Sequence, residues 1–196
     1  VLVLPGAFAT SVCITLDVLD AAAGLAPGLK MPKPTWRVVS PDGGMVPLSS
    51  RVQVATSAIP ARARPDTSTW IVPGLGVNRP VDLAERLADD CATRAVAAVR
   101  RHAARGGALA ASCSAVFLLQ AAGVLQDRRA TTTWWLAPEL RRIEPRCNVD
   151  ADRMVCADGP VSTAGAAFAQ SDLMLHLLRT RFSPSLADAV GKVLLI

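Results

Sequence analysis

The chain has 196 residues, of which 51% are hydrophobic and 19% are charged. This composition predicts one globular domain and excludes a disordered chain. The net charge of +5 comes from 18 Arg and 3 Lys residues that are scattered along the sequence, so no nucleic-acid-binding stripe is predicted. No apolar stretch reaches the roughly 18 residues of a membrane span.

The first half of the chain alternates between strand-like and helix-like segments. In chain order we expect a strand at 1–4, a helix at 14–26, a strand at 35–40 ended by a turn, a strand at 51–57, a strand running into a glycine-rich loop at 68–76, and a helix at 81–104. The last of these is the clearest, because Leu83, Leu87 and Cys91 begin an apolar repeat of four residues.

The second half continues this alternation. We expect a strand at 108–112, a helix at 114–123, a strand at 129–132, a helix at 135–142, a hairpin at 153–165, a helix at 166–180 and a helix from 183 onward with Ser183 as its cap. Strands that alternate with helices predict a mostly parallel sheet covered on both faces. Sites in such folds lie beyond the carboxyl ends of the strands.

The cysteines indicate a reducing compartment, hence the cytoplasm. Their number is odd, their spacing is irregular and no CxxC occurs, so neither a disulfide framework nor a zinc site is supported. They stand at positions 13, 91, 113, 147 and 156.

Cys113 lies where the strand at 108–112 meets the next helix. Its neighbours Ala111, Ser112, Ser114 and Ala115 are all small, as the sharp turn of a nucleophile elbow requires. A helix N-terminus would favour the thiolate, and the Ser114 amide would help to bind an anion. The local pattern fits an inert buried cysteine equally well.

The loop "VPGLG" ends another predicted strand and would face the same site. A second anion donor is expected there, from the amide of Gly74 or Leu75, because glycine permits close approach of the backbone.

Three stretches together resemble the PfpI/ThiJ superfamily, which is class I glutamine-amidotransferase-like. They are "ASCSAVFLLQAAGVL", "DRRATTTWW" and "DGPVSTAGAAFAQSDLMLHLLR". The resemblance is strongest to the domain at the N-terminus of AraC-type transcriptional regulators and covers residues 1–196 as a single domain. It implies a flavodoxin-like three-layer sandwich, a homodimer and a helix-turn-helix domain that this chain lacks.

The resemblance also assigns roles to residues. Cys113 takes the elbow position, and Asp17 matches an acid of the first helix that approaches it. Family enzymes read "ATTHW" where this chain reads "ATTTW", so Thr133 replaces the histidine. His102 and His176 are interpreted as structural, and Trp134 and Trp135 as core residues. The candidate ligand-binding residues are Asp17, Gly74, Leu75, Gly76, Cys113, Ser114 and Thr133.

These observations favour a ligand-sensing, dimerising domain of a transcriptional regulator, without catalysis, because Thr133 cannot act as a base at neutral pH. The expected ligand is a small carboxylate or amide-bearing metabolite. No cofactor, metal or membrane partner is expected. The alternative is a cysteine-dependent hydratase or amidase related to isonitrile hydratase, with Cys113 as nucleophile and Asp17 as acid. A third possibility is a thiol sensor of oxidative stress.

Overall fold

The computed structural model describes residues 1–60, 66–77 and 79–196. Its central sheet has the strand order β4 (Thr69–Val72), β5 (Ala108–Ser112), β9 (Val161–Ala164) and β8 (Val155–Asp158). The first three strands are parallel, and β8 runs antiparallel to β9. This arrangement confirms the mostly parallel sheet and the hairpin that the sequence predicts.

A second sheet holds β1 (Val39–Ser40), β3 (Gln53–Ala58) and β2 (Gly44–Pro47) in that order, and β2 was not predicted. Residues 1–4 lie between the two sheets rather than forming the predicted strand. Leu2 makes one parallel bridge with Val39, and its amide donates to the Ile71 carbonyl at 2.8 Å. The short strands β6 (Arg129–Ala130) and β7 (Asn148–Val149) form a separate parallel pair.

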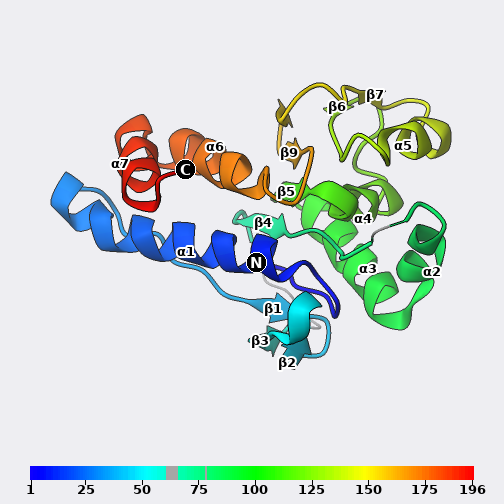
Figure 1. Cartoon of the computed structure of the whole chain (residues 1–196), viewed down its shortest axis with the longest axis horizontal. Coiled ribbons are helices and arrows are strands. Elements are labelled where there is room, and N and C mark those ends of the chain that lie inside the picture. The colour runs from blue at the N-terminus through cyan, green and yellow to red at the C-terminus, as the bar shows by residue number, and fades with distance from the viewer. Residues whose placement is uncertain (61–65, 78) are drawn as a thin grey trace.

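Helices cover both faces of the central sheet (Figure 1). On one side lie α1 (Ala9–Leu25), α6 (Gln170–Arg181) and α7 (Pro184–Leu194), and on the other lie α2 (Asp82–Ala88), α3 (Asp90–Ala104), α4 (Val116–Ala121) and α5 (Ala137–Ile143). Ser183 caps α7 as predicted, because its hydroxyl accepts from the Leu186 amide. The chain therefore forms the predicted three-layer α/β sandwich.

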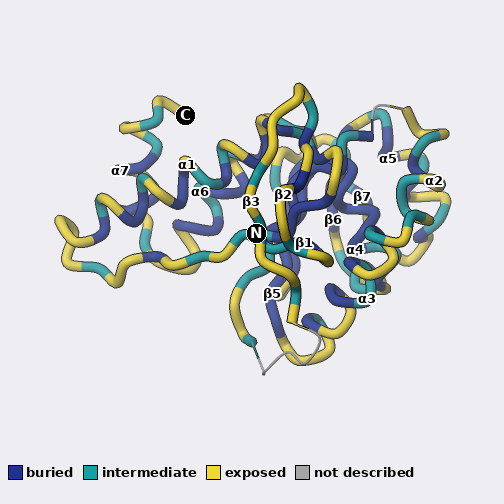
Figure 2. The backbone as a smooth tube through the Cα atoms, turned by 90° about the horizontal axis from the view of Figure 1, so that it is seen from below, coloured by how far each residue is buried: buried dark blue, intermediate teal, exposed yellow. Residues whose placement is uncertain are grey.

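The central strand β5 is buried along its whole length (Figure 2), and its alternating side chains divide the core. Leu109 and Ala111 pack into the cluster beneath α3 and α4, whereas Ala110 packs beneath α1 and α6. A strand buried on both sides needs no polar alternation, which explains its apolar run in the sequence. This central position fixes where the following residue, Cys113, is held.

Two predicted helices have different bounds in the structure. The predicted helix at 81–104 is two helices, because Asp89 is extended and caps α3 by accepting from the Ala92 amide at 2.6 Å. Helix α1 begins at Ala9 rather than at 14. Its N-cap residue Phe8 makes no side-chain capping hydrogen bond, so the sequence carries no capping signal at this start.

The expectation that no apolar stretch reaches the length of a membrane span is wrong for helix α1 together with the 3₁₀ turn η1 that follows it (Ala26–Leu29). Residues Ala9–Leu29 are long and apolar enough to cross a membrane by length and composition. This is weak evidence, because a core helix passes the same test, and α1 packs against α6 and α7.

Candidate functional site

Cys113 occupies a strained turn between β5 and α4. It opens the 3₁₀ turn η3 (Cys113–Ala115) with a φ of 54°, in the left-handed region that non-glycine residues rarely adopt. Such a conformation costs about 1–2 kcal/mol and persists only where the surroundings impose it. The small neighbours Ser112, Ser114 and Ala115 are fully buried, as the tight turn requires.

Two loops hold this turn from outside. The Thr132 hydroxyl donates to the Cys113 carbonyl at 2.8 Å, and the Ser114 hydroxyl accepts from the Leu75 amide at 3.0 Å. A Cβ on Gly74 would lie 3.4 Å from the Cys113 Cβ and 3.2 Å from a ring carbon of Phe8. The glycine-rich loop and the cysteine turn therefore meet at the carboxyl edge of the sheet, as the sequence predicts.

Of the two alternatives predicted for the second anion donor, Gly74 and Leu75, the structure leaves Gly74. The Leu75 amide already donates to Ser114, so it is not free to bind a ligand. Gly76 has a structural role, since its φ is 75° and a Cβ there would lie 2.0 Å from the Gly6 carbonyl oxygen. The amide of Ser114 faces the sulfur and stabilises its charged form.

The predicted preference for thiolate is wrong in direction. Burial raises the pKa of the Cys113 thiol above its ordinary value, and the hydrogen bonds from the Ser114 backbone and hydroxyl offset only part of that effect. Cys113 and Thr133 are each 4% exposed, so both side chains are shielded from solvent in the isolated chain. Because the pKa lies above the ordinary 9.0, we expect the Cys113 thiol to be protonated at neutral pH.

The predicted approach of Asp17 to Cys113 stays a prediction. Asp17 is exposed on α1, and among the described residues no hydrogen bond or ion pair joins it to Cys113. The polar residues on the buried face of α1 are Ser11, whose hydroxyl donates to the Ala167 carbonyl at 3.1 Å, and Thr15, which accepts from the Gln170 amide at 2.8 Å. Their spacing of four residues is the signal that marks this face, and the late predicted start of the helix concealed it.

The threonine run places Thr132, rather than Thr133, against the cysteine residue. Thr133 is buried, and its carbonyl accepts from the amides of Leu136 and Ala137 at the start of α5. Trp134 is 77% exposed, so its prediction as core was wrong, whereas Trp135 packs against the core as expected.

Neither histidine serves Cys113. His102 is buried, stacks on Trp70 with ring centroids 4.6 Å apart, and contacts the Ala108 carbonyl at the opposite end of β5. His176 lies on α6, where burial lowers its pKa and Arg179 and Arg181 lower it further. The stacking and hydrogen bonds of His102 fit the predicted structural role, and the structural role of His176 stays a prediction. Among the described residues, no group of three or more His, Cys, Asp or Glu side chains is arranged to hold a metal.

These features define a three-layer α/β protein with a cysteine on a buried strand-to-helix turn. The chain belongs to the DJ-1/PfpI family, whose model matches residues 29–180.

The relatives include transcriptional regulators. The HTH-type transcriptional regulator GlxA of Rhizobium meliloti is 28% identical over 161 residues, which cover 81% of this chain and 47% of that protein. The chain thus spans about half the length of this relative. An AraC family transcriptional regulator from Pseudomonas putida has the same fold, with a TM-score of 0.78, 23% identity, and coverage of 98% of this chain and 96% of that one.

The fold is shared outside the regulators as well. DJ-1beta of Drosophila melanogaster superposes with a TM-score of 0.74 at 20% identity, covering 100% of this chain and 96% of that one. The fold alone therefore does not separate a regulatory domain from the other members of the family.

Proposed function

We propose that this chain is the ligand-sensing and dimerising domain of an AraC-type transcriptional regulator, located in the cytoplasm. The observation that carries the proposal is the 28% identity to GlxA over a region that is only about half of that regulator. In this proposal a separate helix-turn-helix domain binds DNA, and residues 1–196 form one domain that responds to a small molecule.

The site supports a role without turnover. A cysteine nucleophile needs a base or a depressed pKa, and Cys113 has neither, because burial raises its pKa and both histidines lie elsewhere. Small adjustments of the Cys113 turn would move α4 on one side and the loops at Gly74 and Thr132 on the other. The Cys113 turn is thus suited to transmit a conformational change between α4 and the loops at Gly74 and Thr132.

The gene sequence beyond codon 196 tests the regulator assignment. A reading frame that continues into a helix-turn-helix of roughly a hundred residues is expected. A natural stop codon directly after Ile196 would contradict it.

A turnover assay tests the enzyme alternative separately. Small amides and isonitriles are incubated with the wild type and with Cys113→Ser. We expect no turnover above the background of the Ser variant. Turnover of about 1 per second or more that Cys113→Ser abolishes would establish the enzyme instead.

A further inference from the structure

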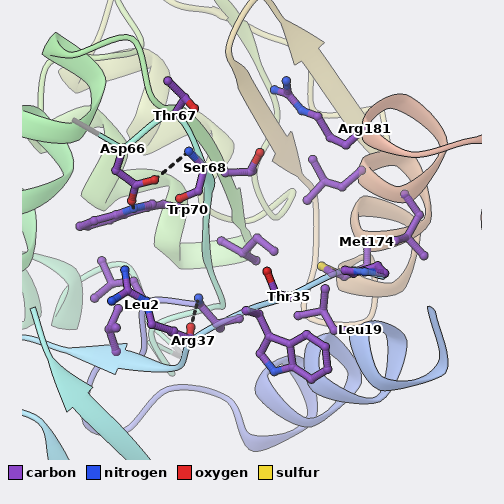
Figure 3. A pocket seen from close by; sticks show the side chains of 18 of the residues that line it. Leu2, Leu19, Thr35, Arg37, Asp66, Thr67, Ser68, Trp70, Met174 and Arg181 are labelled. Atoms are coloured by element: carbon purple, nitrogen blue, oxygen red, sulfur yellow. Dashed lines mark hydrogen bonds between the residues drawn. The ribbon is translucent and has the colours of Figure 1, made fainter. Parts of the chain in front are cut away.

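Figure 3 shows a cavity of about 940 Å³. It lies at the amino end of β4, whereas Cys113 follows the carboxyl end of the parallel strand β5, so the two are at opposite ends of the sheet. The cavity is lined by the residues that enter β4, by the 34–39 segment and by the second half of α6. Cavities of roughly 300–1,000 Å³ are the usual size for small-molecule sites. None of the candidate ligand-binding residues predicted from the sequence lines it.

The walls of this cavity are mostly apolar. Leu19 and Met174 close it from α1 and α6, and the rings of Trp36, Trp70 and Phe182 line its sides. Phe182 remains 39% exposed, which is unusual for a phenylalanine that borders the core. An apolar molecule in this space would cover these rings and gain the free energy of burying them.

Two arginines lining the cavity have no anionic partner. The guanidinium groups of Arg37 and Arg181 form no ion pair or hydrogen bond with any described residue, and both side chains are drawn at this cavity in Figure 3. Positions 61–65 and 78 carry Ala, Arg, Pro and Asn, so they offer no carboxylate either. Elsewhere, eight arginines form ion pairs. Arg37 and Arg181 therefore present uncompensated positive charge to the cavity.

The one carboxylate of the lining is held by the protein itself. Asp66 accepts from the Ser68 amide at 2.9 Å and from the indole nitrogen of Trp70 at 3.3 Å, as Figure 3 shows. Burial raises the pKa of Asp66, but these hydrogen bonds outweigh that effect and hold the pKa below its usual value. Asp66 fixes the position of Trp70 and does not neutralise either arginine.

We propose that this cavity binds an amphipathic organic anion, a small molecule with an apolar body among the aromatic rings and a carboxylate at one of the two arginines, which lie on opposite sides of the cavity in Figure 3. The apolar lining and the unpaired guanidinium groups select for these two parts of the same ligand. The site uses neither Cys113 nor its turn, so it goes beyond the sensing site predicted from the sequence.

Isothermal titration of the chain with decanoate, decanol and acetate tests the ligand class. Decanoate is expected to bind at one site, decanol about tenfold or more weaker because it lacks the charge, and acetate not measurably because it lacks the apolar body. Absence of decanoate binding, or equal binding of decanol, would overturn the proposal.

Variants then locate the site. The double substitution Arg37→Met and Arg181→Met should weaken decanoate binding about tenfold or more. Arg179→Met is the matched control, because Arg179 is on the same helix but is paired with Asp188 and lies outside the cavity lining; it should leave the affinity within about twofold. Equal losses in the double variant and in the control would contradict the site.

A third variant separates this site from the proposed function. Cys113→Ser should bind decanoate as the wild type does, since the two sites lie at opposite ends of the sheet. Loss of binding in Cys113→Ser would place the ligand at the cysteine turn instead. A stop codon after Ile196 would refute the regulator assignment while leaving these titrations unaffected.

Discussion

At Cys113 a non-glycine backbone is held at a φ of 54°, and burial of the side chain raises the pKa of the thiol. Glycine would relieve the backbone strain, so the retained side chain points to a use for the sulfur at this position. Thr132, Gly74 and Ser114 impose the conformation, each through a contact with the turn or its neighbouring loop. The structure thus separates two properties of an elbow cysteine: the geometry is present, and the activation is absent.

Alkylation of individual cysteines should reflect this shielding. At neutral pH, iodoacetamide is expected to label Cys113 about tenfold or more slowly than the exposed Cys13, because only the thiolate reacts and burial raises the pKa of Cys113. The rate at Cys113 should keep rising with pH through and above 9.0, the ordinary thiol value.

Peptide mass spectrometry at a series of pH values gives both rates. Cys113→Ser serves as the control for assigning the labelled peptide, and it should retain the wild-type fold. Preferential labelling of Cys113 at neutral pH would show an activated thiolate and contradict the structure.

At the scale of the elements, local sequence patterns correctly predicted the strands and turns that are determined by residues close together in the sequence. Strand β5, the turn at Cys113 and the β8–β9 hairpin follow from short runs of small, alternating or turn-forming residues. The break at Asp89 was missed because the four-residue apolar repeat continues across it. The break is visible only in the extended backbone of Asp89 and its bond to the Ala92 amide.

The site was harder to predict because its contacts are distant in sequence. The bond from Thr132 to Cys113 spans 19 residues, and the bond from Leu75 to Ser114 spans 39. No periodicity distinguishes Thr132 from Thr133, since both are buried in the same run. The cavity at Arg37 and Arg181 is lined by residues that are far apart in the sequence, and nothing in the local sequence marks them as neighbours.

The loop at Gly76 should tolerate no side chain. Gly76→Ala is expected to lower the free energy of unfolding by about 2–4 kcal/mol, because the residue has a φ of 75° and the new Cβ would meet the Gly6 carbonyl oxygen. Gly24→Ala is the matched control. Gly24 is exposed in α1 with nothing within 4 Å of the added Cβ, so the change should stabilise by about 0.5–1 kcal/mol.

Denaturant unfolding of both variants measures the two free energies. If Gly76→Ala unfolded like the wild type, the close approach of the glycine-rich loop to residues 5–7 would be wrong.

For the whole molecule, the distribution of charge predicts weak binding to DNA. Among the described residues, eight arginines are paired with carboxylates at separate places on the surface, which offsets part of the positive charge that DNA phosphates would need. We expect residues 1–196 to bind two unrelated duplexes equally, with dissociation constants of roughly 10⁻⁴–10⁻⁶ M that weaken steeply with salt. Fluorescence anisotropy at low and physiological salt measures this, and tight salt-resistant binding to one sequence would show that the chain itself reads DNA.

The whole molecule is also proposed to form a homodimer. Two exposed aromatic residues on neighbouring loops are the candidates for its interface. Trp134 is 77% and Phe168 is 74% exposed. Their loops meet, because a Cβ on Gly165 would lie 3.5 Å from the Thr132 carbonyl oxygen. Large apolar side chains gathered on a surface mark a contact with another protein.

Substitution of these residues should therefore dissociate the dimer. Trp134→Ser with Phe168→Ser is expected to shift the chain to a monomer at tens of micromolar, on the order of ordinary assay concentrations, because the interface loses its largest apolar groups. Val81→Ser is the control, since Val81 is 76% exposed but precedes α2. Light scattering gives the mass of each form. A wild-type monomer would refute the dimer, and a dimer that survives the double substitution would place its interface on another face, away from the cysteine turn.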